Sequence, residues 1–260
     1  MHKLKIISVA IALVLMVILS IILLQPEKSV VENIPEVEYA KEPVPDFNQY
    51  QNVKDKKQAF FNYLRPAVQT QNDYIRSVRQ LIQGFRAKEI SGEQLTDKQS
   101  EELTWLMNEY RVDSDQNSEA IYAELLRKVD IIPMELVLVQ TANESAWGTS
   151  RFATKGYNFF GLWCFKKGCG FVPKRRNDGA AHEVAKFDNL SSAMYSYMRN
   201  INRHPAYKDL RVIRQKHRNN QQDITAYSLA EGLTKYSERG EEYVEELRQM
   251  IRVNKELMSS

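Results

Sequence analysis

An uncharged segment near the amino terminus divides this chain into two parts that need different surroundings. Nineteen consecutive residues, Ile6 to Leu24, carry no charge. As a helix they would measure about 28 Å, which matches the hydrocarbon core of a bilayer. Basic residues precede the segment, so we expect the amino terminus to stay in the cytoplasm. A cleaved signal peptide shows the same order of residues, but this segment is long for one and no small-x-small cleavage site ends it. The sequence therefore predicts that residues 1–24 form a cytoplasmic tip and an uncleaved signal anchor, which binds the lipid bilayer through residues 6–24.

The segment that follows the predicted anchor is acidic and contains four prolines. Residues 25–46 hold six acidic residues against two lysines. Charged, proline-containing segments of this kind are typical of extended linkers with little order. The whole chain is 43% hydrophobic and 27% charged, which is ordinary for a folded protein. We therefore expect residues 25–46 to tether the anchor to a folded body that begins at about residue 47.

Most of the body shows helical periodicity. In residues 47–128 the pattern predicts a helical region with the segments Lys57–Leu64, Pro66–Phe85, Asp97–Tyr110 and Ser118–Lys128. In residues 129–260 it predicts Pro133–Gly148, Ser191–Asn202, Ala206–His217, Asp223–Leu233 and Glu241–Leu257. Two extended segments, Phe171–Lys174 and Glu183–Phe187, flank an Asn-Asp-Gly turn and predict a small hairpin. The predicted fold class is mainly α with a small β-hairpin, in which residues 47–128 either brace the second region or lengthen its groove.

One carboxylate stands at the end of an otherwise apolar predicted helix. A proline suited to the first turn opens the segment Pro133–Gly148 and a glycine closes it. Leu136, Gln140 and Glu144 fall on one row of i, i+4 positions, so Glu144 follows the buried stripe to the helix end. The negative end of the helix dipole and limited hydration both raise the pKa of a carboxyl group there, which suits a general acid. The alternative is a helix-terminal glutamate that meets solvent or a nearby arginine such as Arg151.

Several ordered blocks carry a resemblance to a known family. They are Ala142–Gly148, Asn158–Gly161, Ala185–Phe187 with Ala193–Tyr197, and Tyr236–Tyr243. Together they resemble the signature of glycoside hydrolase family 73, which contains lysozyme-like β-N-acetylglucosaminidases of bacterial peptidoglycan. The resemblance covers residues 129–255, about half the chain. It implies that residues 129–260 form a glucosaminidase-like catalytic domain with a lysozyme-like fold.

The resemblance also implies an activity. We expect a peptidoglycan hydrolase that cleaves the β-1,4 bond after N-acetylglucosamine, with Glu144 as general acid and glycan strands as partners. The predicted location is the inner membrane, crossed once, with the catalytic domain in the periplasm. We expect no cofactor, and no basic stripe indicates binding to nucleic acid. The alternative enzyme is a lytic transglycosylase or a muramidase. The alternative that is not an enzyme is a peptidoglycan-binding scaffold that lacks a second catalytic group beside Glu144.

The second catalytic group is harder to predict. Hydrolysis of a glycoside needs an acid and a group that stabilises the positively charged sugar. Many family members carry a second glutamate on the hairpin, where this chain has the basic run Lys174–Arg176. Of the carboxylates available there, we expect Glu183 to act and Asp178 to serve the turn. If neither acts, the acetamido group of the substrate could supply the nucleophile. Tyr236 matches the tyrosine that opens the late family motif and is expected to orient that group or stabilise charge.

The remaining candidates wall the site or support it. Trp147 and Phe160 are expected to line it, because aromatic faces bind sugar rings, and Asn158 is expected to join them while shaping the turn after the helix. Cys164 and Cys169 lie five residues apart, and outside the cytoplasm we expect them to form a disulfide. The alternative for the two cysteines is a metal site completed by His182.

Overall fold

The computed structural model describes residues 29–173 and 182–259. The chain forms two compact units, Met1–Asn33 and Ile34–Ser260. In the described part of the first unit, the backbone amides of Glu32 and Asn33 donate hydrogen bonds to the Ser29 carbonyl and form a turn. No helix within residues 29–173 and 182–259 is long and apolar enough to cross a membrane. The predicted anchor over residues 6–24, the basic run Lys174–Arg176 and Asp178 lie outside the described residues.

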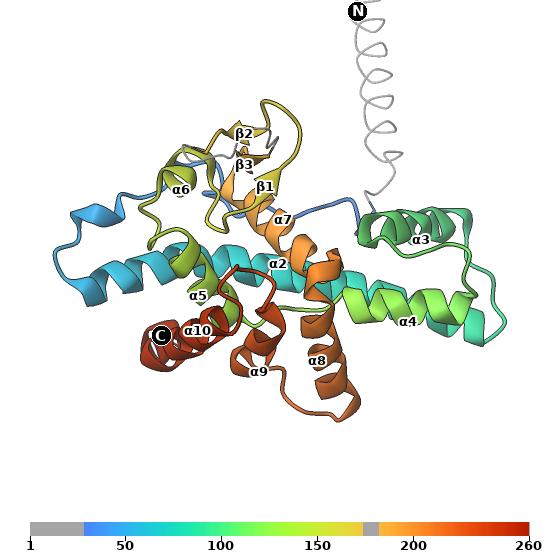
Figure 1. Ribbon diagram of the computed structural model, residues 1–260. Helices are drawn as coiled ribbons and strands as arrows, with labels where there is room; N and C mark the ends of the chain where they lie inside the picture. The colour runs from blue at the N-terminus through green and yellow to red at the C-terminus, as the bar shows by residue number, and fades with distance from the viewer. Residues whose placement is uncertain (1–28, 174–181, 260) are drawn as a thin grey trace, which may run out of the picture. The chain divides into compact units, whose positions relative to one another are not determined.

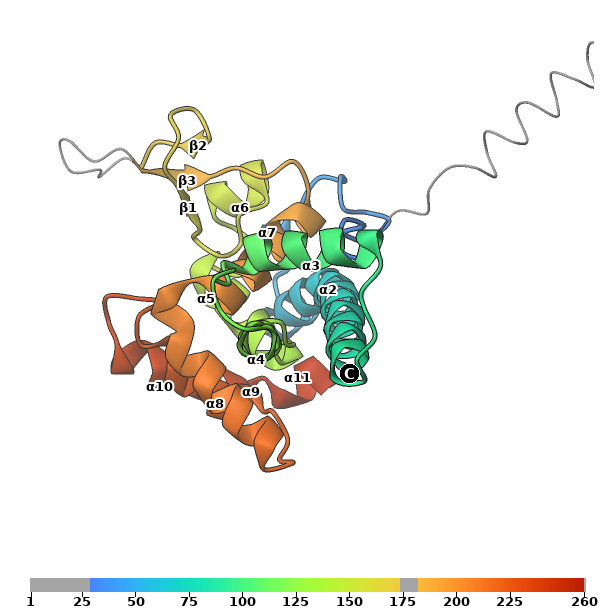
Figure 2. The same ribbon diagram turned by 90° about the vertical axis from the view of Figure 1, so that its right-hand side faces the viewer.

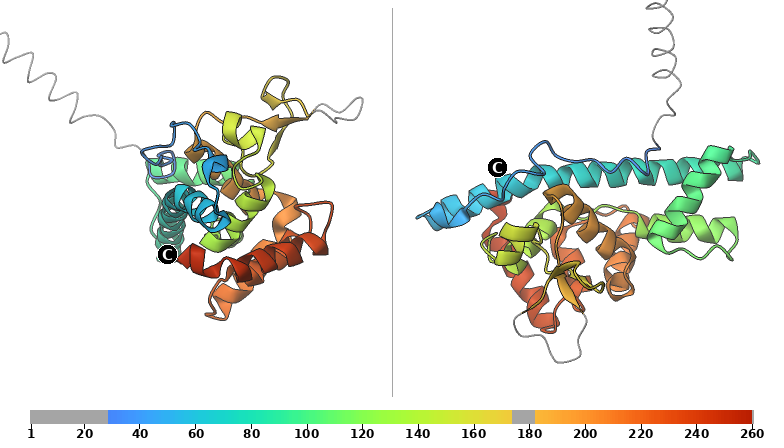
Figure 3. Two further views of the ribbon diagram at one scale, coloured as in Figure 1. Left: turned by 90° about the vertical axis from the view of Figure 1, so that its left-hand side faces the viewer. Right: turned by 90° about the horizontal axis from the view of Figure 1, so that it is seen from above.

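Helix α2 (Val53–Ile90) is the longest helix of the second unit and contacts α4, α5 and α7. It runs along one side of the other helices of the unit (Figure 3). The sequence predicted two helices here, broken at Pro66, and that prediction is wrong because the helix continues through the proline. Proline removes one backbone hydrogen bond from a helix interior. Fully buried apolar side chains flank it on both sides, at Phe60, Phe61, Leu64, Ala67 and Val68, and their packing offsets that loss.

The other helices confirm a mainly α fold (Figure 1). The α-helices are α3 (Asp97–Tyr110), α4 (Ser118–Lys128), α5 (Met134–Glu144), α6 (Arg151–Gly156), α7 (Leu190–Arg203), α8 (Lys208–Asn219), α9 (Ala226–Ala230), α10 (Glu241–Val253) and α11 (Lys255–Ser259). Short 3-10 helices in the described residues are η1 (Phe47–Gln49), η2 (Pro205–Tyr207) and η3 (Glu231–Leu233). Helices α3 and α4 have the predicted bounds. The single helix predicted at the carboxyl end is divided at Asn254, a buried residue whose side chain accepts a hydrogen bond from Lys57 Nζ at 2.9 Å.

A small antiparallel sheet lies beside α6 (Figure 2). Its strands are β1 (Trp163–Cys164), β2 (Gly170–Phe171) and β3 (Glu183–Ala185), in the order β1-β3-β2. The two strands predicted for the hairpin pair as β2 and β3, and the predicted turn between them lies outside the described residues. Strand β1 pairs with the other edge of β3. Gly170 allows this close pairing, because a Cβ atom there would stand 2.0 Å from the carbonyl oxygen of Val184.

Residues 34–46 lie against the body of the second unit. Ala40 is 1% exposed, and its carbonyl accepts a hydrogen bond from the Leu190 amide at 2.9 Å. The amide of Val37 donates to Ser191 Oγ at 3.0 Å. The expectation of a poorly ordered linker is therefore wrong for this stretch, because its backbone hydrogen-bonds to the first turn of α7. Those bonds join positions more than a hundred residues apart, so local composition could not predict them.

Candidate active site

Glu144 is the last residue of α5, and the predicted row of inward positions is confirmed. Leu136 is fully buried, Gln140 is 1% exposed, and Glu144 is half-buried where the helix ends. The helix ends four residues before the predicted stop at Gly148. Ala146 and Trp147 adopt left-handed conformations, with φ of 51° and 59°, so the chain turns away at once and leaves the carboxylate at the end of the helix.

The Glu144 carboxylate lines a cleft of about 1240 Å³. The walls come from the end of α5, the segment that leads into β1, the carboxyl-terminal half of α7 and the loop between η3 and α10. Phe160 and Tyr236 line the same cleft, so the structure brings these two predicted residues together with Glu144. Phe160 is 1% exposed and stacks on Tyr197, with ring centroids 4.3 Å apart.

A chain of hydrogen bonds between buried side chains leads to the Glu144 carboxylate. The Tyr197 hydroxyl donates to Gln140 Oε1 at 2.6 Å, and Gln140 Nε2 donates to the Tyr243 hydroxyl at 3.2 Å. The Tyr243 hydroxyl in turn hydrogen-bonds the Glu144 carboxylate. Tyr197, Gln140 and Tyr243 are all at most 1% exposed. Because the Tyr243 oxygen accepts from Gln140, its proton is left to donate to Glu144, and this bond helps to orient the carboxylate.

Opposing influences act on the pKa of Glu144. Burial raises it, and it is the largest effect, because a carboxylate loses hydration inside a protein. The Tyr243 hydrogen bond and the positive charge of Arg239 favour the ionised form, while the negative charge of Glu246 opposes it. The result is a pKa above the ordinary value for glutamate. A half-buried carboxyl with a raised pKa can hold a proton and deliver it to a bound group, which is what a general acid needs.

Gly161 and Tyr236 shape the space next to the Glu144 carboxylate. Gly161, at φ +64°, leaves a gap that a side chain would fill, since a Cβ atom there would stand 3.4 Å from Glu144 Oε2. Tyr236 donates its hydroxyl proton to the Phe160 carbonyl at 2.7 Å and stacks on Tyr243 at 5.6 Å. Burial raises the pKa of Tyr236 well above its usual range, so this hydroxyl keeps its proton.

Trp147 does not line the cleft that holds Glu144. It borders a separate hollow of about 420 Å³, which Lys57 and Glu246 also line. The ammonium of Lys57 lies 4.9 Å from its ring centroid, and the edges of Phe60 and Phe61 pack against it. The left-handed turn directly after Glu144 carries Trp147 to this second hollow.

Asn158 is 1% exposed and organises the segment that leads into β1. Its amide nitrogen donates to the carbonyls of Leu162 and Ala185, and its oxygen accepts from the amides of Phe160 and Leu162. These four bonds use the full hydrogen-bonding capacity of the side chain. The expected role in shaping the turn is therefore present, whereas the expected contact with substrate has no free group to make it.

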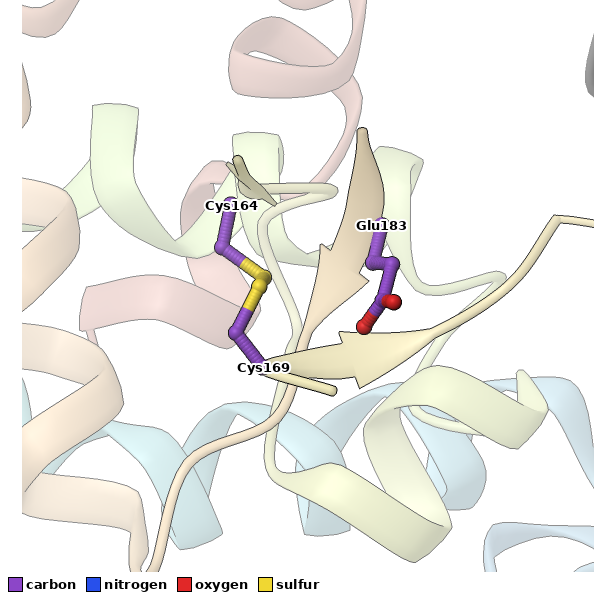
Figure 4. Close-up of side chains that lie close together, drawn as sticks. All are labelled: Cys164, Cys169 and Glu183. Atoms are coloured by element: carbon purple, nitrogen blue, oxygen red, sulfur yellow. A yellow bond between two sulfur atoms is a disulfide. The ribbon is translucent and has the colours of Figure 1, made fainter. Parts of the chain in front are cut away.

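Glu183 lies beside the disulfide and outside the cleft. The bond between Cys164 and Cys169 is present as predicted, with Cα atoms 6.3 Å apart (Figure 4). Glu183 is 4% exposed, and its two oxygens accept from the amides of Gly168 and Gly170 at 2.9 and 2.8 Å. The carboxylate therefore caps the loop that the disulfide closes. Because the sulfurs are bonded to each other, the alternative of a metal site at the two cysteines is wrong.

Four residues around Glu144 were not predicted from the sequence: Gln140 as a hydrogen-bonding residue, Gly161, Arg239 and Tyr243. Each had a local signal. Gln140 lies on the same helical row as Glu144, and the other three fall in the blocks that carry the family resemblance. Gln140 reaches the carboxylate only through Tyr243, and Gly161, Arg239 and Tyr243 come from other segments of the chain, so spacing alone did not assign them.

Comparison with known proteins identifies the family of the chain. Residues 119–256 match the glucosaminidase family model, described as mannosyl-glycoprotein endo-β-N-acetylglucosaminidase. The chain is 30% identical over 218 residues to protein bax of Escherichia coli (strain K12), which covers 84% of this chain and 76% of that protein. No solved structure matches the chain. The match extends from α4 to α11 and includes every residue placed around Glu144. The chain therefore belongs to the glucosaminidase family of glycoside hydrolases, as a Bax-type member.

Proposed function

We propose that this protein hydrolyses bacterial peptidoglycan at the β-1,4 bond that follows N-acetylglucosamine, with Glu144 as the general acid. The observation that carries the proposal is the half-buried Glu144 carboxyl, whose pKa is raised and which hydrogen-bonds Tyr243 in a cleft large enough for several sugar rings. The family match supplies the class of substrate. The resemblance to glycoside hydrolase family 73 indicates which polymer is the substrate and which of its bonds is cleaved.

In this mechanism Glu144 gives its proton to the glycosidic oxygen as the bond from that oxygen to C1 breaks. The sugar ring then carries positive charge, and the leaving chain departs as an alcohol. The new carboxylate accepts the Tyr243 hydrogen bond, which stabilises the charge it has just acquired. Glu144 then takes a proton from water as the water oxygen bonds to C1, which restores the acid.

The substrate itself is assigned the role of the second catalytic group, the one that stabilises the positively charged sugar. Among the described residues, the only carboxylates that line the cleft are Glu144 and the exposed Glu238. The 2-acetamido carbonyl oxygen of N-acetylglucosamine can bond to C1 while the leaving group departs, and that bond breaks again when the water oxygen bonds to C1. Tyr236 orients the acetamido group. Its hydroxyl donates a hydrogen bond to the Phe160 carbonyl, so the hydroxyl oxygen can accept one from the acetamido N–H.

The test is digestion of purified peptidoglycan by the full-length protein beside Glu144→Gln, followed by borohydride reduction and mass spectrometry of the new ends. Reduced N-acetylglucosamine ends made only by the unaltered protein would support the proposal. Anhydromuramic or reduced muramic ends would assign a lytic transglycosylase or a muramidase. Binding without cleavage by either protein would assign a scaffold.

We also propose that residues 6–24 anchor the protein in the inner membrane, with the catalytic domain in the periplasm. The uncharged segment supports the anchor. The disulfide between Cys164 and Cys169 supports an oxidising compartment, since the cytoplasm keeps thiols reduced. A carboxyl-terminal alkaline phosphatase fusion would be active if the domain is exported. An inactive fusion would place the domain in the cytoplasm.

A further inference from the structure

One wall of the cleft is strongly basic. Arg111, Arg199, Arg203 and His204 all line it. Arg199 and Arg203 come from the last turns of α7, and His204 caps that helix. Arg111 comes from a different part of the chain, at the left-handed end of α3 with φ 54°. It precedes residues 119–256, which match the family model, so the helical region before the family domain contributes a side chain to the cleft.

The positive charge of this wall is only partly neutralised. The Glu109 carboxylate lies 3.0 Å from Arg199 Nη1 and 3.6 Å from Arg203 Nη1. That carboxylate also accepts a hydrogen bond from the Tyr195 hydroxyl at 2.6 Å. Arg111 is exposed and forms no ion pair or side-chain hydrogen bond with the part of the chain that the structure describes. Arg199 and Arg203 therefore share the Glu109 carboxylate, and the charge of Arg111 is not paired within the described residues.

The backbone that carries Arg111 is fixed in place. The buried ammonium of Lys128 donates to the carbonyls of Tyr110 and Arg111 at 3.0 and 2.9 Å. Arg203 Nη1 donates to the Glu109 carbonyl at 2.8 Å, which joins the end of α3 to α7. The backbone that bears Arg111 is therefore held beside α7 before any ligand arrives, so binding need not order it.

The basic wall is continuous with the site around Glu144. The ring of His204 lies 5.8 Å from that of Tyr207, and the ring of Tyr207 lies 5.7 Å from that of Tyr236. Tyr236 stacks on Tyr243, which hydrogen-bonds Glu144. A polymer bound across Glu144 and along these rings would pass the three arginines.

We infer that Arg111, Arg199 and Arg203 form a subsite for carboxylate groups that project from the glycan strand. Guanidinium groups bind carboxylates with strong, directional hydrogen bonds. In peptidoglycan the muramic acid residues carry such groups, either in the peptide stem or in the free lactyl group of a strand without stems. The inference rests on the proposed function and adds its specificity: strands that carry carboxylates should be preferred over neutral N-acetylglucosamine polymers.

The test uses Arg111→Gln and Arg111→Glu in the full-length protein. Glutamine keeps the same left-handed backbone cost as arginine, so the first variant should fold normally. Arg252→Gln is the matched control, because Arg252 is exposed on α10 and lines neither the cleft nor the second hollow. Each protein is given intact peptidoglycan, strands whose stems an amidase has removed, and chitin oligosaccharides, which have the same linkage and no carboxylate.

We expect Arg111→Gln to lower kcat/KM about tenfold on a carboxylate-bearing strand, and Arg111→Glu to lower it further. Both variants should cleave chitin oligosaccharides within about twofold of the unaltered protein, and Arg252→Gln should behave normally throughout. The loss should shrink at 0.5 M salt because salt screens exposed charges. A loss on stripped strands assigns the lactyl carboxylate, and a loss confined to intact peptidoglycan assigns the stem.

Binding separates failure of this inference from failure of the proposed function. Binding of the three glycans is measured in the Glu144→Gln background, with and without Arg111→Gln. If no glycan is cleaved but the arginine change still weakens binding to carboxylate-bearing strands, the subsite stands and the hydrolase proposal fails. If cleavage occurs and Arg111→Gln matches Arg252→Gln on all three glycans, or weakens all three equally, the subsite is overturned and the hydrolase proposal stands.

Discussion

The hydroxyl of Tyr243 donates a hydrogen bond to Glu144 and accepts one from Gln140 Nε2 at 3.2 Å. Tyr243 therefore stabilises the ionised form of a carboxyl group that burial otherwise keeps protonated. Two opposing effects set the pKa of one residue, and burial is the larger of them.

Tyr243→Phe should raise the pKa of Glu144 further, because it removes a donor that stabilises the carboxylate. A general acid is active while protonated, so the alkaline limb of the pH–rate profile should move to higher pH. The rate at the optimum should fall, because the orientation of the acid is lost. The profile of kcat/KM measures both effects. Tyr227→Phe, at an exposed tyrosine, is the control. A limb that moves to lower pH would contradict the assignment.

Glu144→Gln should reduce hydrolysis by at least about 10²-fold, the scale of general acid catalysis. It should also change how stability depends on pH. A carboxyl with a raised folded pKa contributes stability that is fully present below the unfolded pKa, about 4.3, and is lost as pH rises through the folded pKa. Glutamine has no such loss. The Tm of the variant should therefore rise relative to the unaltered protein with increasing pH, and a constant difference across the pH range would show that the folded pKa is not raised.

Gly161→Ala should damage activity more than stability. The added Cβ would stand 3.4 Å from Glu144 Oε2, and a left-handed φ of +64° costs a non-glycine residue about 1 kcal/mol. Gly92→Ala is the matched control, since Gly92 has φ +80° and nothing within 4 Å of its Cβ position. Thermal unfolding should show a similar loss for both variants, while kcat should fall only for Gly161→Ala. Equal kcat values for the two variants would mean that the reaction does not need the open space between Gly161 and the Glu144 carboxylate.

Glu183→Gln should destabilise the disulfide loop without removing catalysis. The change replaces one of two carboxylate oxygens that accept backbone amides, at a cost of about 1–3 kcal/mol. Hydrolysis below the melting temperature should stay within a few-fold of normal. An activity loss as large as that of Glu144→Gln, in a protein that is still folded, would restore Glu183 as the second catalytic group.

Local chemistry explains what the sequence predicted correctly. The bounds of α3 and α4 and the inward row that ends at Glu144 follow from hydrogen bonds and side-chain periodicities within a few residues, and β2 pairs with β3 across a short stretch of chain. The bond between Cys164 and Cys169 joins residues close in the chain, so their spacing and the expected compartment were enough to predict it.

By itself, then, the sequence determined the helical class, the family and the candidate acid. Only the tertiary structure decided that α2 continues through Pro66, that residues 34–46 dock on α7, and that Glu183 caps a loop outside the cleft. It also decided which side chains surround Glu144 and brought Arg111 from outside the family domain into the same cleft. The physical reason is that burial and hydrogen-bond partners come from segments far apart in the chain, whereas sequence patterns record only what neighbouring residues do to one another.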